Sequence, residues 1–282
     1  MFLPDLLAEK TILVTGGGSG LGRSFALRLA ELGASLAICG RRKDVLEATA
    51  QEIQVVSRAR VSAHVCDIRD PAAVEGMFET IWKEGPLDGL INNAAGNFIA
   101  RTETLSPRGV DSILNVVLHG TFYATVAAGR RWIAENRPGT VLSIVSSAAE
   151  AGRAFTVPSA AAKAGVVAMM KSLAVEWGPH GIRALSVAPG LFPTKGAWDR
   201  LYPDGSQKRE QAADVPLRRT GEHIEIANLI AYLMSDHAGY ITGDTITIDG
   251  GRDLLNGGGA GVTGLFDWTP EQWDAFRRQA RS

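Results

Sequence analysis

Three parts of this sequence carry side chains whose types and spacing could do chemistry. Residues 15–22 read TGGGSGLG, and glycines in such a run let the backbone approach a phosphate group closely. Arg41 follows the next apolar run, and a guanidinium can bind a phosphate through two parallel hydrogen bonds. Ser146, Ser159 and Lys163 lie at spacings of thirteen and four residues. Together these residues indicate a bound nucleotide beside a cluster of hydroxyl and ammonium groups.

The glycine-rich run lies between a predicted strand, 11–15, and a predicted helix, 20–32. A tight turn there needs glycine, and the helix N-terminus presents free N–H groups and a positive dipole end to a pyrophosphate. The candidate cofactor-binding residues of this turn are Gly16, Gly18, Ser19, Gly20, Leu21 and Gly22. A purely structural turn also uses glycine, but the strand–turn–helix context favours nucleotide binding.

The end of the second predicted strand indicates which nicotinamide cofactor binds. An acidic residue there would accept hydrogen bonds from the adenosine ribose of NAD, and none is present. Arg41 could instead bind a 2′-phosphate, which favours NADPH, although Arg41 and Arg42 could also simply begin a solvated helix. Asp67 follows the third strand and could contact the adenine, or it could cap the helix that begins near Pro71.

Composition excludes several other classes of protein. With 29 basic and 30 acidic residues the net charge is −1, which argues against nucleic acid as a partner. No apolar run is long enough to span a bilayer, and no secretory signal is evident, so we expect neither membrane insertion nor export. The two cysteines and five histidines have no metal-ligand spacing, so no metal site is expected. Such sparse cysteine suits a cytoplasmic location.

The candidate residues are spread over alternating strand and helix patterns. The predicted strands are 11–15, 35–39, 61–66, 87–91, 140–145, 182–187 and 245–248. The predicted helices are 20–32, 43–56, 71–83, 107–135, 158–177, 222–234 and one near 270–278. This alternation predicts a single α/β domain, 1–282, with a doubly wound, parallel, seven-stranded Rossmann sheet in three α/β/α layers. A polar and aromatic insertion at 190–213 and a tail at 252–282, with glycines at 257–261, interrupt the pattern.

Four motifs resemble those of the short-chain dehydrogenase/reductase family over nearly the whole chain. They are the glycine turn at 16–22, NNAAG at 92–96, Pro189-Gly190 with Thr194, and DGG at 249–251. The family's usual catalytic pattern is a serine, a tyrosine and a lysine at these same spacings, but Ser159 occupies the tyrosine position here. A serine hydroxyl is too weak an acid to exchange a proton with a carbinol oxygen, so oxidation of a simple alcohol is disfavoured.

One branch of that family has the same serine, the 2,4-dienoyl-CoA reductases, and the mitochondrial type is most similar. The resemblance runs through CDIRDP (66–71), NNAAGNF (92–98), PSAAAKAGV (158–166), LAVEWG (173–178), TKGAWDRL (194–201) and TPEQWD (269–274). It implies NADPH-dependent reduction of a 2,4-dienoyl thioester to a 3-enoyl-CoA in the β-oxidation of unsaturated fatty acids. Such chemistry needs donors at an oxyanion rather than a strong acid at an alcohol.

The resemblance also implies roles for individual residues. Asn97 would contact the thioester oxygen, and Lys163 would bind the nicotinamide ribose beside Ser159. Further cofactor contacts are implied for Asn93, Ala94, Gly96, Pro189, Gly190 and Thr194. Acyl-CoA contacts are implied for Arg69, Phe98, Ser106 and Arg200. Three of these residues could instead have an ordinary structural role: Asn97 could satisfy backbone groups, Lys163 could be a surface lysine, and Arg200 could belong to a solvated basic face.

The chain departs from the branch at Ala148, where the mitochondrial type has a tyrosine as second donor. Ser146, Ser147 or a water molecule could supply that hydroxyl. A reductase of another enoyl-CoA or acyl thioester, or an NADPH-binding protein without catalysis, therefore remain alternatives. The family's usual homotetramer would bury helices 107–135 and 158–177. His119, on the first of these, is expected to be a packed or interface residue.

Overall fold

In the computed structural model the described residues are 2–57, 59–194, 215–256, 264–265 and 267–279. Most of the predicted insertion, 190–213, and the glycines at 257–261 lie outside this part of the chain.

Among the described residues, seven strands form one parallel sheet, as the apolar runs predict. The strands are β1 (Thr11–Thr15), β2 (Ser35–Gly40), β3 (Val61–Val65), β4 (Gly89–Asn92), β5 (Gly139–Ile144), β6 (Ile182–Pro189) and β7 (Thr245–Ile248). Their order across the sheet is β3-β2-β1-β4-β5-β6-β7, and every neighbouring pair is parallel. The strand order reverses between β1 and β4, and ligands of open α/β sheets bind beyond the carboxyl ends of the strands at such a point.

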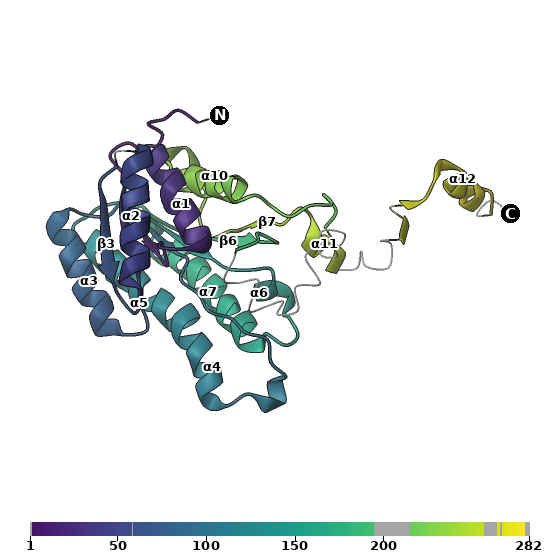
Figure 1. Ribbon diagram of the computed structural model, residues 1–282, viewed down its shortest axis with the longest axis horizontal. Helices are drawn as coiled ribbons and strands as arrows, with labels where there is room; N and C mark the ends of the chain where they lie inside the picture. Colours follow the sequence, from purple (N-terminus) through teal and green to yellow (C-terminus); the bar gives the residue numbers. More distant parts are fainter. Residues whose placement is uncertain (1, 58, 195–214, 257–263, 266, 280–282) are drawn as a thin grey trace.

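Helices cover both faces of the sheet (Figure 1). They are α1 (Gly20–Glu31), α2 (Lys43–Ser57), α3 (Pro71–Glu84), α4 (Pro107–Leu114), α5 (Gly120–Ala134), α6 (Ala148–Ala151), α7 (Val157–Glu176), α10 (His223–Met234), α11 (Arg252–Asn256) and α12 (Pro270–Gln279). The three-layer Rossmann architecture is therefore confirmed. The short helices α6 and α11 were not predicted, because four or five residues carry no helical period. In Figure 1, α12 lies apart from the sheet.

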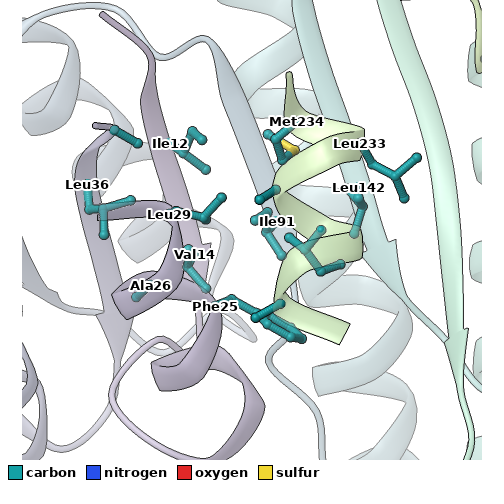
Figure 2. Close-up of a cluster of buried hydrophobic side chains, with 14 of the residues drawn as sticks. Ile12, Val14, Phe25, Ala26, Leu29, Leu36, Ile91, Leu142, Leu233 and Met234 are labelled. Carbon is teal, nitrogen blue, oxygen red and sulfur yellow. The ribbon is translucent and has the colours of Figure 1, made fainter. Parts of the chain in front are cut away.

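Alternate residues of each central strand enter two separate cores, as the period of two requires. Ile12 and Val14 of β1 face the core formed with α1 and α10, whereas Leu13 faces the core formed with α3, α5 and α7. Figure 2 shows part of the first of these, where Phe25 of α1 and Met234 of α10 lie in the same core over the sheet. Burial on both faces explains why the strands are nearly continuous apolar runs.

The predicted helix 107–135 is interrupted by one π-helical turn, Asn115–His119, between α4 and α5. Contrary to the expectation from the sequence, the whole stretch Pro107–Ala134 is long and apolar enough to cross a membrane by length and composition alone. Half of its most apolar window is buried inside the protein, so packing on the sheet accounts for this composition.

Both cysteines are buried and free beside the edge strand. Cys39 lies in β2, and the backbone N–H of Cys66 donates to the Gly40 carbonyl at 2.9 Å. Burial raises the pKa of both thiols, that of Cys66 to about 11.

Candidate active site

The glycine turn follows β1 at the carboxyl edge of the sheet and could accommodate no other residue at several positions. Gly16 and Gly20 have φ angles of +66° and +55°, a region that L side chains rarely adopt. A Cβ atom on Gly22 would lie 2.3 Å from the Gly16 carbonyl oxygen and 2.5 Å from Asn93 Nδ2. The turn is therefore packed against the end of β4 as tightly as backbone allows.

The N-terminus of α1 is suited to an anion. Its N-cap residue, Ser19, makes no capping hydrogen bond with its side chain, and no acidic residue lies in the first turn. The unpaired N–H groups and the helix dipole are thus available to a pyrophosphate, so the predicted cofactor-binding residues of this turn fit that group.

Arginines surround the end of β2. The guanidinium of Arg42 donates to Ser19 Oγ at 3.2 Å, which the sequence reasoning did not foresee because it singled out Arg41. Arg41 is exposed and its charge contributes to lowering the pKa of Asp67. A negative group outside Ser19 would therefore meet the guanidinium of Arg42, next to Arg41 in the chain.

The predicted alternative for Asp67, helix capping, is wrong. Asp70 caps α3 instead, accepting a hydrogen bond from the N–H of Ala72 at 2.9 Å. The Asp67 carboxylate accepts from Arg69 Nε at 2.9 and 3.0 Å, and this hydrogen-bonded pair lowers the pKa of Asp67. The residues implied for the adenine and for the acyl-CoA thus lie side by side.

Thr15 connects β1 to the end of β4, and the sequence reasoning missed it. Its hydroxyl accepts from the N–H groups of Asn93 and Ala94, both at 3.0 Å. Asn93 Nδ2 in turn donates to the Thr15 carbonyl at 3.0 Å. A threonine that ends a buried apolar strand was the available indication of this role.

The segment after β4 places Asn97 at the same edge. Gly96 lies against the π-helical turn, since a Cβ there would be 3.5 Å from Val116 Cγ1. Asn97 Oδ1 accepts from the N–H of Phe98 at 2.9 Å. The amide oxygen is thereby occupied, whereas Asn97 Nδ2 donates to no described residue. The structural role, in which Asn97 satisfies a backbone group, therefore accounts for its amide oxygen. Its amide nitrogen is left to donate to a ligand.

Lys163 is a buried cation one helical turn beyond Ser159 in α7. Its side chain is almost fully buried, and Nζ donates to the carbonyl of Ile144, the last residue of β5. Burial lowers the pKa of Lys163 from 10.5 to about 8. The alternative of a surface lysine is thus wrong. Ser146 lies two residues beyond Ile144 in the chain, so this hydrogen bond places Lys163 beside the segment that carries Ser146.

Ser146 and Ser147 connect β5 to α6. The Ser146 carbonyl accepts from the N–H of Ala149 at 2.9 Å, and Ser147 caps α6 without a side-chain hydrogen bond. Both serines are partly buried at the carboxyl end of β5. Ala148, the first residue of α6, places only a methyl group there.

The end of β6 completes the cofactor edge. A Cβ on Gly190 would lie 2.6 Å from Asp249 Cα, so the strand needs glycine beside β7. Thr194 lies over the glycine turn, with Cγ2 3.5 Å from a Cβ built on Gly20.

Two of the predicted acyl-CoA residues, Phe98 and Ser106, lie together near Gly109, where an added Cβ would be 3.8 Å from Phe98 Cζ and 3.4 Å from Ser106 Oγ. Ser106 caps α4, accepting from the N–H of Gly109 at 3.1 Å, and Phe98 packs against the small core around Val117. Arg69 is paired with Asp67. Arg200 and the basic residues near it lie outside the described residues.

The π-helical turn is a feature that sequence periodicity could not reveal. It begins at Asn115, whose Oδ1 lies 2.8 Å from His119 Nδ1, and it packs on α7. Such turns occur frequently at functional sites. His119 is exposed in a single chain, so its expected packing is not made within the described residues of one copy. No group of three potential metal ligands occurs among the described residues.

Comparison with known proteins assigns the chain to a known family. Residues 16–253 match the family model described as enoyl-(acyl carrier protein) reductase. An uncharacterized oxidoreductase of Caenorhabditis elegans is 44% identical over 275 residues, which cover 96% of this chain and 88% of that protein.

Two further relatives have names that state an activity. "Probable 2,4-dienoyl-CoA reductase 3 [(3E)-enoyl-CoA-producing]" of C. elegans is 42% identical, with 95% of this chain and 88% of that protein covered. "Probable 2,4-dienoyl-CoA reductase [(2E)-enoyl-CoA-producing]" of Bacillus subtilis is also 42% identical, with 88% of this chain and 98% of that protein covered.

Solved structures agree with this grouping. A short-chain dehydrogenase of Bacillus anthracis has a TM-score of 0.79 at 40% identity, covering 87% of this chain and 97% of that one. An Agrobacterium tumefaciens protein solved with bound NADP has a TM-score of 0.81 at 30% identity, with 90% and 100% covered. Fold, glycine turn and family model agree, and the chain belongs to the short-chain dehydrogenase/reductase family of oxidoreductases.

Proposed function

We propose that this protein reduces 2,4-dienoyl-CoA thioesters to 3-enoyl-CoA with NADPH, in the β-oxidation of unsaturated fatty acids. The observation that carries this proposal is Ser159, one helical turn before the buried Lys163, where an alcohol dehydrogenase of this family would have tyrosine. Relatives at 40–42% identity whose names state this activity support the proposal.

The residues of the chain would bind and orient the reactants, while the cofactor supplies a hydride when bound. Asn97 Nδ2 is the donor we assign to the thioester oxygen, because Asn97 Oδ1 is already occupied by the N–H of Phe98. A donor fixed in place before the reaction stabilises charge that develops on that oxygen, by about 3–4 kcal/mol for one good donor.

Lys163 would bind the hydroxyls of the nicotinamide ribose. The same ammonium donates to the Ile144 carbonyl, so its position depends on β5 rather than on a flexible chain. Although burial lowers its pKa to about 8, Lys163 is mostly charged at neutral pH and can donate hydrogen bonds to the ribose.

Preference for NADPH is proposed from the two arginines that follow β2. Arg42 already reaches Ser19 Oγ, and Arg41 is close enough to influence Asp67. Two guanidinium groups would favour a cofactor with a 2′-phosphate over one with a free ribose hydroxyl.

The direct test mixes the purified protein with NADPH and 2,4-hexadienoyl-CoA and follows nicotinamide absorbance. Consumption of NADPH should depend on the dienoyl thioester, and NADH should be a poorer donor. Proton NMR of the product should place the remaining double bond at carbon 3. A product with the bond at carbon 2 would correct the product assignment, because relatives of both types are similar to this chain.

Two other results would replace the proposal. Turnover of a 2-enoyl-CoA but of no dienoyl-CoA would indicate another acyl thioester reductase. Binding of NADPH without turnover of any thioester would indicate a protein that binds the cofactor without catalysis. We further propose a homotetramer built on the α4–α5 stretch and α7, and a cytoplasmic location, which cell fractionation would test.

A further inference from the structure

One histidine joins three segments that surround the glycine turn. His223 is the first residue of α10. Its Nδ1 lies 2.8 Å from Ser24 Oγ in α1, and its Nε2 lies 2.8 Å from the Pro193 carbonyl oxygen. Both ring nitrogens are therefore engaged.

The partners determine the direction of each hydrogen bond. A carbonyl oxygen can only accept, so Nε2 carries a proton and donates to Pro193. In the neutral ring Nδ1 then accepts from the Ser24 hydroxyl. That hydroxyl has a second acceptor within reach, the Gly20 carbonyl at 3.2 Å, but the contact with Nδ1 is shorter. His223 thus joins the first turn of α1 to the segment after β6.

The residues between the end of β6 and Pro193 are each held by a hydrogen bond or by burial. Gly190 donates to the Ile248 carbonyl, the Leu191 carbonyl accepts from Gly221, and Phe192 is buried. The bond from His223 to Pro193 is the next attachment. Thr194 is the next residue in the chain and lies against Gly20 of the glycine turn. Ser24, the other partner of His223, also lies within hydrogen-bond distance of the Gly20 carbonyl. His223 therefore connects two segments that both contact Gly20.

We propose that His223 is a positioning residue for the nicotinamide cofactor. It holds Pro193 and Thr194 against the glycine turn before the cofactor arrives, so that binding does not have to order them. Preorganisation of this kind raises affinity without a new contact to the ligand. The proposal rests on cofactor binding by the proposed function and is independent of which thioester is reduced.

Two substitutions separate the two hydrogen bonds of the ring. The amide nitrogen of glutamine can replace Nε2, so His223→Gln keeps a donor for Pro193. The amide of asparagine reaches only the Nδ1 position, so His223→Asn keeps the contact with Ser24 and loses that with Pro193. His223→Ala loses both. His180, an exposed histidine whose side chain makes no hydrogen bond to a described residue, provides the matched control as His180→Ala.

The experiment measures the dissociation constant of NADPH by fluorescence titration, with melting temperatures recorded in parallel. We expect His223→Ala and His223→Asn to weaken NADPH binding about five- to tenfold, as the loss of one hydrogen bond does. His223→Gln and His180→Ala should stay within twofold of the unmodified protein. If a thioester is turned over, kcat at saturating NADPH should change less than twofold.

Two results would overturn the proposal. One is unchanged NADPH affinity in His223→Asn. The other is an equal loss in His223→Gln and His223→Asn, which would show that cofactor affinity does not depend specifically on the hydrogen bond to Pro193. Because titration needs no turnover, either result stands even if the dienoyl-CoA assay fails.

Discussion

At the scale of single residues, the site is defined by which polar atoms the protein has already used. Asn97 has its oxygen bonded to the next backbone N–H and its Nδ2 without a described partner. Lys163 has a backbone acceptor and a lowered pKa. The sequence identified both residues, but only the contacts show what each can still offer to a ligand.

Asn97→Ala should lower kcat for the dienoyl thioester about 10²–10³-fold, because a donor aimed at the developing oxyanion is lost. The dissociation constant of NADPH should change less than twofold. Asn97→Asp is the matched variant, since it keeps the shape and replaces the donor by an acceptor; it should be at least as slow. Equal losses of rate and NADPH affinity in Asn97→Ala would contradict the assigned role.

Lys163 should make stability depend on pH above neutrality. Its pKa is about 8 in the folded chain and 10.5 without burial, so between these values the unfolded chain binds more protons. The free energy of unfolding should therefore rise with pH across that window, relative to a Lys163→Met variant that lacks the group. Below about pH 8 the difference between the two proteins should be constant.

Urea denaturation of both proteins at pH 7.5, 8.5 and 9.5 provides this comparison. Taking the difference between the proteins removes the titration of groups that they share. A difference that falls with rising pH would show that the buried amine is stabilised in its charged form.

At the scale of elements, hydrogen bonds at the N-termini of helices distinguish polar residues that cap a helix from those that do not. Asp70 and Ser106 each accept a backbone N–H in the first turn of their helix, and Asp67 does not cap. Asp70 followed by Pro71 is a typical start of a helix and predicts the cap of α3 correctly. The sequence left open the role of Asp67, because that role depends on the pairing of Asp67 with Arg69, a contact between side chains.

Asp70→Ala should lower the free energy of unfolding by about 1 kcal/mol, the usual cost of losing an N-cap. Asp67→Ala should leave helix capping intact and instead weaken NADPH binding. Chemical denaturation and NADPH titration of the two variants form a matched pair. Loss of stability in Asp67→Ala as large as that in Asp70→Ala would mean that the pair with Arg69 is mainly structural.

At the scale of the whole molecule, exposed apolar side chains mark the surface through which we propose the tetramer forms. Phe122 and Val126 of α5 are 42% and 37% exposed and lie one helical turn apart, and Val175 of α7 is 80% exposed. Helices that are apolar on their outer face need a partner, which a second copy would supply.

Val126→Lys combined with Phe122→Lys should shift the mass measured by light scattering from tetramer to a smaller species. Val55→Lys on α2, where Val55 is 84% exposed, is the control and should leave the mass unchanged. A monomer in the unmodified protein would refute the proposed assembly.

The sequence predicted the sheet well because each strand is buried on two faces and therefore reads as an apolar run. It also predicted the elements that carry the candidate catalytic residues, with Ser146 just after β5 and Ser159 and Lys163 in α7. It could not predict the π-helical turn at Asn115, which leaves no period, or the contact between Arg42 and Ser19. Those depend on how loops from distant parts of the chain meet.

The two buried thiols have a practical consequence for studying the protein. With their pKa values raised by burial, Cys39 and Cys66 carry little thiolate at neutral pH, and thiolate is the form that alkylating reagents attack. An engineered surface cysteine would therefore be the preferred target of a maleimide dye. The native protein thus permits fluorescent labelling at a chosen position, without first removing either of its own cysteines.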